Sequence, residues 1–310
     1  MPNKIATLIG LSAIVMWASM VGLLKQVSQS LGPDLSITLV YSLSAILVLI
    51  IFRFPDFKRI PKNYLLLSTI LFVIYELCFS FAIAYSETAQ QAIEVSIINY
   101  LWPSLTIFAF VCFKELKFNI LIVMGLLLSI SGIILIQAGN GDFSLNRVMQ
   151  NFDRNPLSYI LAFIGAVIWA FYCVVTKKMS RGYNPISIFF IVVALTLWVK
   201  FLGTHPREIP EIHISTFFSL FIAACTVGLG YAAWNIGIIH GNITVIVVAS
   251  YFTPVISSLI AMWILKAELS ENFWQGTLLV TLGSLICWMS TNWVAIKPIF
   301  KKLKNLLNIS

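Results

Sequence analysis

Long apolar runs dominate this chain of 310 residues and limit what it can fold into. A membrane-spanning helix needs about 20 apolar residues, and the runs lack the period-2 alternation of barrel strands. The sequence therefore predicts an all-α integral membrane protein with ten transmembrane helices. The runs are separated by short breaks and lie at about 5–25, 36–53, 64–86, 90–113, 118–138, 157–177, 186–203, 215–239, 243–265 and 273–294.

Charged residues are too few to cover a surface that faces water. They make up 10% of the chain, against about 25% in a soluble domain, which excludes a soluble enzyme, a disordered chain and a secreted module. The first run extends from Ile5 to Leu24 and exceeds the 7–15 residues, roughly, of a signal-peptide core. We expect it to be a retained first helix.

The net charge of +8 comes from basic residues that lie between the apolar runs. This placement indicates membrane topology rather than a nucleic-acid partner, because Lys and Arg concentrate on the cytoplasmic side. With the N-terminus inside, the outer connections hold only Lys25, Arg147, Arg154, Lys200, Arg207 and Lys266. We therefore expect both termini in the cytoplasm.

The two halves of the chain resemble each other at an offset near 151–152 residues. The stretch 15–18 (VMWA) matches 167–170 (VIWA), and 99–103 (NYLWP) matches 250–254 (SYFTP). Five helices per repeat force the halves into opposite orientations, an arrangement found in transporters with a site at the midplane. A duplicated scaffold without transport is the alternative. The expected units are a repeat at 1–138, an external connector at 139–156, a repeat at 157–294 and a tail at 295–310.

Two segments outside the apolar runs have amphipathic patterns. In the connector, Leu145, Val148, Met149 and Phe152 recur at helical spacing and predict a short helix on the outer surface. The basic tail 295–310 predicts a cytoplasmic helix held by anionic membrane lipid, with a solvated tail as the alternative. The sequence leaves the oligomeric state open, and a monomer is compatible with it.

Paired glycines mark the last helix of each repeat. Gly125 and Gly132 are seven residues apart, as are Gly276 and Gly283, so each pair lies on one helix face. Small residues let helix backbones approach closely in a bilayer. We interpret these two helices as packing elements rather than as part of a substrate site.

Two acidic residues, Glu76 and Glu94, lie deep within apolar runs. Ionisable groups in a membrane usually face a cavity or a partner, so either carboxyl group could bind a substrate ammonium group or a proton. A hydrogen-bonded packing role is the alternative. Glu94 is the favoured candidate, because on a continuous helix it shares a face with Trp102, just before Pro103.

Aromatic and polar residues accompany the two glutamates in the middle of several runs. Mid-run Trp and Tyr do not fit the aromatic belts at membrane surfaces, so we expect a central substrate site, with core packing as the alternative for each residue. Pro103 and Pro254 free a backbone carbonyl one turn earlier and are the expected hinges. The candidate binding residues, besides the glutamates, are Tyr75, Asn99, Tyr100, Trp102, Trp169, Tyr172, Trp234, Asn235 and Tyr251.

No catalytic or metal-binding motif accompanies this set. The chain has no GxSxG, HExxH or Walker A sequence, and its five cysteines and three histidines have no metal-ligand spacing. We expect no catalytic residues, no metal, no cofactor and no enzyme activity.

The repeats resemble EamA repeats of the drug/metabolite transporter superfamily over about residues 1–294. The resemblance is carried by QQAIEVSIINYLWPSLTI, PLSYILAFIGAVIWAFYCVVTKK, YAAWNIGIIHGN and SYFTPVISS. It implies a ten-helix basket in the bacterial inner membrane that exports aromatic or other neutral amino acids, or related small metabolites, by alternating access. It also implies a cavity lined by Tyr75, Tyr100, Trp102 and Trp169. Two alternatives remain, an exporter of another metabolite or cationic drug-like compound, and a membrane enzyme or structural subunit.

Overall fold

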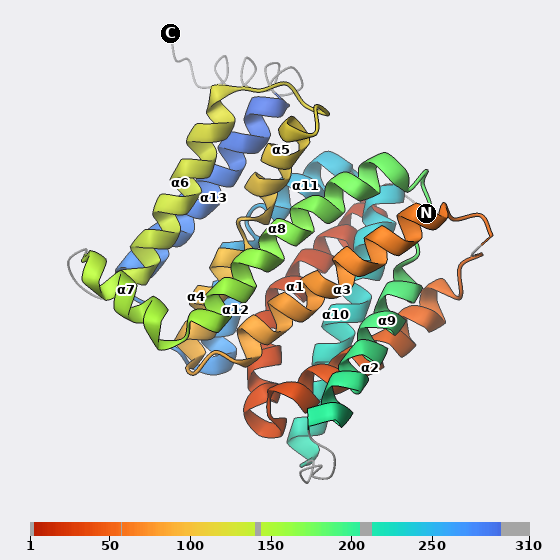
Figure 1. Ribbon diagram of the computed structural model, residues 1–310, viewed down its shortest axis with the longest axis horizontal. Helices are drawn as coiled ribbons and strands as arrows, with labels where there is room; N and C mark the ends of the chain where they lie inside the picture. The colour runs from red at the N-terminus through yellow and green to blue at the C-terminus, as the bar shows by residue number, and fades with distance from the viewer. Residues whose placement is uncertain (1–2, 57, 140–143, 205–212, 293–310) are drawn as a thin grey trace.

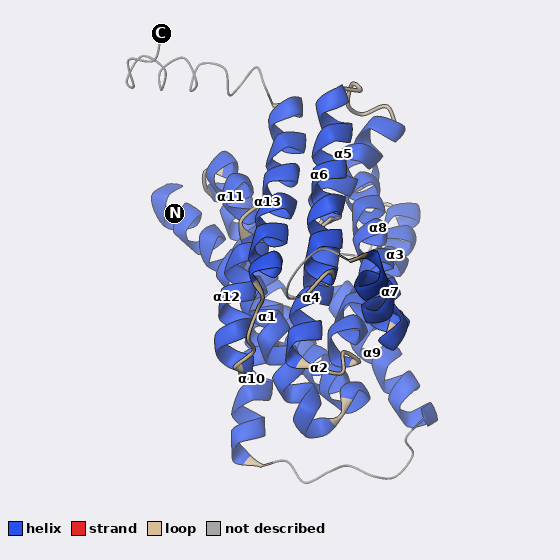
Figure 2. Cartoon of the chain, turned by 90° about the vertical axis from the view of Figure 1, so that its left-hand side faces the viewer, coloured by secondary structure: helices blue, strands red, loops and turns tan. Residues whose placement is uncertain are grey.

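A computed structural model describes residues 3–56, 58–139, 144–204 and 213–292. The secondary structure of these residues is helical throughout (Figure 2). The helices are α1 (Asn3–Leu31), α2 (Pro33–Phe52), α3 (Lys62–Ala84), α4 (Ala89–Asn99), α5 (Trp102–Cys112), α6 (Ile120–Gln137), α7 (Leu145–Arg154), α8 (Pro156–Met179), α9 (Ile186–Thr204), α10 (Ile214–His240), α11 (Ile243–Ser250), α12 (Thr253–Leu265) and α13 (Glu271–Thr291).

Nine spans among the described residues are long and apolar enough to cross a membrane, which confirms the all-helical membrane class. One of them, 89–112, combines α4 and α5 across a break in the helix. The predicted run 243–265 contains a corresponding break and is divided into α11 and α12, of 8 and 13 residues. Each piece alone is shorter than a membrane span, which explains why nine spans are found where the sequence predicts ten.

The principal helix contacts connect the two halves of the chain. Helix α1 packs against α10 and α12, and α8 packs against α3 and α5. Helix α2 packs against α9, where Trp198 Nε1 donates a hydrogen bond to Ser42 Oγ at 2.9 Å. The halves therefore interlock over the length of the bundle (Figure 1).

Helices α6 and α13 pack against each other, as Figure 2 shows. Their glycines face each other in two pairs, Gly125 with Gly283 and Gly132 with Gly276. A Cβ atom built on Gly132 would lie 2.5 Å from the carbonyl oxygen of Gly276, and one on Gly125 would lie 2.5 Å from the carbonyl of Gly283. The predicted close approach of the backbones is confirmed.

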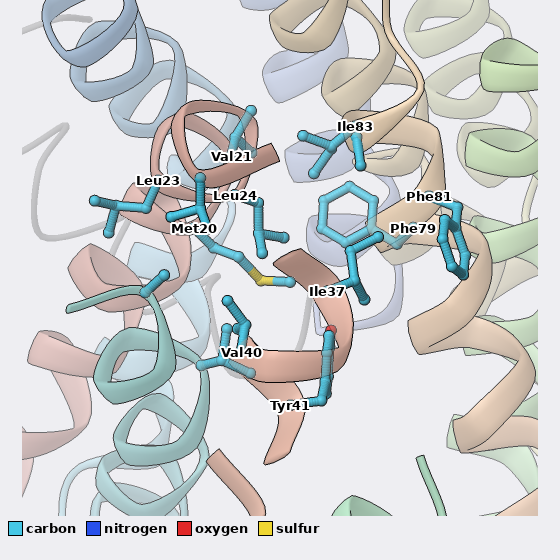
Figure 3. Close-up of a cluster of buried hydrophobic side chains, with 14 of the residues drawn as sticks. Met20, Val21, Leu23, Leu24, Ile37, Val40, Tyr41, Phe79, Phe81 and Ile83 are labelled. Carbon is cyan, nitrogen blue, oxygen red and sulfur yellow. The ribbon is translucent and has the colours of Figure 1, made fainter. Parts of the chain in front are cut away.

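A large apolar core lies where α1, α2, α3, α9 and α10 meet. Figure 3 shows part of it, with Met20 and Leu24 of α1, Ile37 and Tyr41 of α2, and Phe79 of α3 in one cluster. Tyr41 belongs to this core, and its hydroxyl group donates a hydrogen bond to Glu76, a residue of the cavity described below.

The connector between the halves contains helix α7, which lies beside α6 at the edge of the bundle (Figure 1). The sequence pattern predicts a helix here. Met149 and Phe152 of its apolar set are exposed, while the side chains of Leu145 and Val148 are outside the described part. The predicted tail helix at 295–310 also lies outside the described residues.

Candidate functional site

Two broken helices bring backbone and side chains into the middle of the bundle. Pro103 lacks an N–H group and cannot continue the hydrogen-bond ladder to the carbonyl of Asn99, so α4 ends at Asn99 and α5 begins at Trp102. The second half repeats this geometry before Pro254, with α11 ending at Ser250 and α12 beginning at Thr253. Each expected hinge residue is thus the second residue of the helix that begins after a break.

A cavity of about 590 Å³ lies beside the breaks. Eight of the candidate residues line it, and they come from α3, α4, the break between α4 and α5, α5, α8 and α10. They are Tyr75, Glu76, Asn99, Tyr100, Trp102, Trp169, Tyr172 and Trp234. Cys173 and Thr253 also line the cavity.

Aromatic rings form much of the cavity wall. Trp169 lies at the centre of one group, with ring centroids 4.4 Å from Tyr75, 4.9 Å from Tyr172 and 6.2 Å from Trp102. A second group is formed by Trp17, whose ring lies 5.1 Å from Tyr231. Such surfaces bind flat apolar groups, because aromatic rings attract each other in offset and edge-to-face geometries.

Glu76 of α3 supplies a buried carboxyl group to the cavity and is only 2% exposed. Tyr41 of α2 donates a hydrogen bond to its Oε2 at 2.5 Å, and Tyr231 of α10 donates one to its Oε1 at 2.6 Å. Both lengths are at the short end of the range for hydrogen bonds donated by hydroxyl groups. Three helices therefore hold both oxygens of Glu76 in place.

The other predicted carboxyl group, Glu94, does not line the cavity. It is 6% exposed and accepts a hydrogen bond from Gln90 Nε2 at 2.7 Å. The inference that Glu94 shares a face with Trp102 assumed one continuous helix. Because the helix is broken between Asn99 and Trp102, the helical phase does not extend from one residue to the other.

Two further candidate residues are placed differently from the cavity group. Tyr251 lies in the second break, outside the cavity lining, with its ring 6.2 Å from that of Trp288. Asn235 belongs to α10, but its side chain is outside the described part of the structure.

The candidate list leaves out Trp17 and Tyr231, which line the cavity, and Tyr41, which does not line it but donates a hydrogen bond to Glu76. Trp17 could have been found from the repeat, because it occupies the position that matches Trp169. Tyr231 stands three residues before Trp234 in the same apolar run. Tyr41 has no comparable signal, since a lone tyrosine in a run is also common in a core.

The cavity reaches one end of the bundle at the connection between α8 and α9. Lys177, Ser180, Tyr183 and Asn184 line it there. This connection turns through Arg181 and Gly182, whose φ angles of 51° and 84° are in the left-handed region. Lys177 and Glu76 are the charged residues among the described cavity lining, one at the mouth and one in the interior.

At the opposite end of the bundle, the cavity lining gives way to polar contacts around the corner between α3 and α4. Lys25 of α1 is 5% exposed, and its Nζ donates a hydrogen bond to the carbonyl of Ser86. Lys200 of α9 forms an ion pair with Asp34 of α2. Tyr85 connects to this pair, donating to Asp34 Oδ1 at 3.1 Å and accepting from Lys200 Nζ at 3.2 Å. We call this group the corner clamp.

Apolar spans that enclose an aromatic cavity, open at one end and clamped at the other, define a multi-pass membrane protein with a site for a small solute. Comparison with known families agrees with this class. The chain belongs to the EamA-like transporter family, which matches residues 4–138 and 156–289. The family predicted from the sequence motifs is thereby confirmed.

Individual relatives cover nearly the whole chain. It is 46% identical to "Aromatic amino acid exporter YddG" of Salmonella typhimurium (strain 14028s / SGSC 2262), over 94% of this chain and 99% of that protein. It is 48% identical to the protein of the same name from Escherichia coli (strain K12), with the same coverage. One solved crystal structure has the same fold, with a TM-score of 0.66 and 20% identity over 94% of this chain and 99% of that chain.

Proposed function

We propose that this protein exports aromatic or other neutral amino acids, and related small metabolites, across the bacterial inner membrane. The observation that carries the proposal is the aromatic cavity with one buried, doubly hydrogen-bonded carboxyl group. The relatives named as aromatic amino acid exporters support the same substrate class.

The cavity offers complementary groups for two parts of such a substrate. The rings of Tyr75, Trp102, Trp169 and Tyr172 suit an aromatic or apolar side chain. The carboxylate of Glu76 suits the ammonium group, since buried charges require a partner of opposite sign. The breaks before Pro103 and Pro254 are where the cavity walls can bend.

The packing supports ten membrane-spanning helices in two inverted repeats. If α1, α2, α3, α4–α5 and α6 correspond to α8, α9, α10, α11–α12 and α13, each principal contact has a counterpart. The α1–α10 contact becomes α8–α3, the α1–α12 contact becomes α8–α5, and α2–α9 and α6–α13 map onto themselves. The proposed units are 1–138 and 157–294, with an external connector at 139–156 and a cytoplasmic tail at 295–310.

The unequal ends of the bundle support transport by alternating access. The end at Lys177 and Tyr183 gives access to the cavity, and the corner clamp closes the other end. With both termini in the cytoplasm, the open mouth faces the cytoplasm and admits the substrate. Release on the outer side then requires the contacts of Lys25 and Lys200 to break.

A second candidate substrate class is a cationic drug-like compound. The observation that favours it is the charge of the interior. Of the two charged residues in the described lining, Glu76 lies in the interior and Lys177 lies at the mouth, so a substrate carboxylate beside Glu76 has no lining cation next to it. If the substrate is instead a different neutral metabolite, it offers Glu76 no cation, and Glu76 binds a proton.

A flux assay in proteoliposomes tests these classes directly. We expect labelled phenylalanine to cross faster than in protein-free vesicles and to be competed by other aromatic amino acids. Competition by an organic cation lacking a carboxyl group, with no phenylalanine flux, would replace the amino acid proposal with the second class. The same assay with and without a pH gradient separates a facilitator from a proton-coupled exporter.

The aromatic wall makes a graded prediction. Trp102→Ala and Trp169→Ala should each weaken phenylalanine transport about two- to tenfold in apparent affinity, because one ring contact contributes about 0.5–1.5 kcal/mol. Trp263 of α12 is 80% exposed on the outside of the bundle and provides a matched tryptophan control. Equal losses in Trp263→Ala would contradict a specific role of the cavity rings.

The basic residues make a prediction about topology. A fluorescent protein fused after Ser310 should fluoresce, and alkaline phosphatase fused there should be inactive, because both termini are expected to lie in the cytoplasm. A phosphatase fused in the connector near Arg154 should be active. The reverse pattern at the two sites would invert the orientation and place the open mouth outside.

A further inference from the structure

A second hollow of about 380 Å³ lies next to the mouth of the cavity but is separate from it. It is formed where the start of α3 meets the end of α8 and the connection that follows it. Its lining has three basic residues and no acidic one, and consists of Pro61, Lys62, Asn63, Lys178, Met179 and Arg181.

The hollow has an excess of positive charge. Lys178 forms an ion pair with Glu115 at 3.2 Å, so its charge is offset. Lys62 and Arg181 form no ion pair with any carboxylate among the described residues. Two cations are therefore available to a ligand, and Arg181 carries a rigid fork of donors that suits a phosphate group.

The backbone adds donors at the same place. Helix α3 begins at Lys62, and its N-cap Pro61 provides no side-chain cap. The first N–H groups of a helix have no acceptor within it, and the helix dipole favours an anion at this end. The lining cations and this helix end therefore point to the same kind of ligand.

An apolar surface continues from the hollow along the outside of the bundle. Leu66 and Ile70 follow Lys62 at intervals of one helical turn and are exposed, Leu66 by 66%. On the other side, the Nζ of Lys178 lies 5.6 Å from the ring of Phe113, which contacts the exposed Phe171 of α8. A ligand in the hollow thus has apolar surface beside it on both helices.

We propose that this hollow binds the phosphate headgroup of an anionic phospholipid, with its acyl chains against α3 and α8. Basic hollows between membrane helices recognise anionic headgroups by this combination of charge and adjoining apolar surface. The leaflet follows from the orientation in the proposed function and is the cytoplasmic one.

The position of the hollow connects this lipid to the transport cavity. Lys178, Met179 and Arg181 face the hollow, whereas Lys177, Ser180 and Gly182 face the cavity mouth. The same short segment therefore separates the two. A headgroup held by Lys62 and Arg181 ties the start of α3 to this segment and fixes the width of the mouth.

Native mass spectrometry of the purified full chain tests the binding. With phosphatidylglycerol, we expect one lipid to stay bound under activation that removes phosphatidylethanolamine, and Lys62→Gln/Arg181→Gln to reduce its occupancy about tenfold. The control Lys58→Gln/Lys117→Gln removes the same charge from neighbouring connections, and neither residue lines the hollow. Equal occupancy in the two double variants would overturn the site.

Two further measurements separate the source of the phosphate and the effect on transport. Inorganic phosphate or glycerol phosphate should not displace the bound lipid; displacement at similar concentrations would assign the site to a free anion instead.

Adding phosphatidylglycerol to phosphatidylethanolamine vesicles should change the flux of the wild type and of the control variant about fivefold. The same addition should leave the flux of Lys62→Gln/Arg181→Gln unchanged. An unchanged wild-type flux would overturn the link to the mouth. The binding measurement requires no transport, so its result is independent of the proposed substrate.

Discussion

Replacing Gly276 with leucine is expected to remove nearly all correctly folded protein from the membrane. A Cβ atom at this position would lie against the carbonyl oxygen of Gly132 and 2.6 Å from Ile136 Cγ1. Overpacking costs about 1–3 kcal/mol where side chains can move aside, but here a helix backbone has to move. Gly276→Ala should give a smaller loss of the same kind, although alanine favours a helix by about 1 kcal/mol over glycine.

Gly203 provides the matched control for this prediction. It lies near the end of α9, and a Cβ atom there would meet nothing within 4 Å. Gly203→Ala and Gly203→Leu should therefore resemble wild type in membrane yield, in monodispersity on size exclusion and in heat resistance in detergent. If the Gly276 variants behave like the Gly203 variants, the contact between α6 and α13 does not determine the stability of the fold.

Glu76→Gln is expected to reduce the apparent affinity for an amino acid about 10- to 100-fold. A hydrogen bond to a charged group contributes about 1.5–3 kcal/mol, and glutamine keeps the size of Glu76 but has no charge for the substrate ammonium. Tyr41 and Tyr231 remain able to hold the amide, so the fold should be retained. The measurement is concentration-dependent flux at equal protein incorporation, from mildly acidic to mildly alkaline pH.

Glu94→Gln is the control, because Glu94 is also buried but lies outside the cavity lining. We expect it to transport like wild type. If Glu76→Gln keeps its affinity but loses a pH dependence present in wild type, Glu76 carries a proton instead of binding the ammonium. If Glu94→Gln shows the larger loss of affinity, the ammonium group binds beside Glu94 on α4 and not at Glu76 in this cavity. Normal transport by both variants at every pH would make the two glutamates packing residues.

Helix positions were predictable from sequence to the extent that hydrophobic runs determine them. Nine runs became long apolar spans, because a run of that length has few stable alternatives in a bilayer. The interruptions at Tyr100 and Tyr251 were indicated only by the prolines that follow them. A proline shows that the hydrogen-bond ladder must open, but tertiary packing decides the residue at which the helix stops.

The cavity was predictable where residue types were unusual for their surroundings. Trp102 and Trp169 stood out because tryptophan is uncommon in the middle of a run, and both line the cavity. Glu94 was as unusual as Glu76, yet only Glu76 lies there. The difference depends on helix phase across a break and on the hydroxyl groups of Tyr41 and Tyr231, which come from distant helices and leave no local pattern.

Cys173 lets the cavity be labelled chemically without introducing a new cysteine. It lines the cavity close to Trp169 and Tyr172, whereas Cys78 and Cys287 are buried. In a chain that keeps Cys173 as its sole thiol, alkylation by a membrane-impermeant maleimide requires an aqueous path to this residue. Applying the reagent to one face of the membrane at a time then reports which gate is open, and protection by substrate reports occupancy of the cavity.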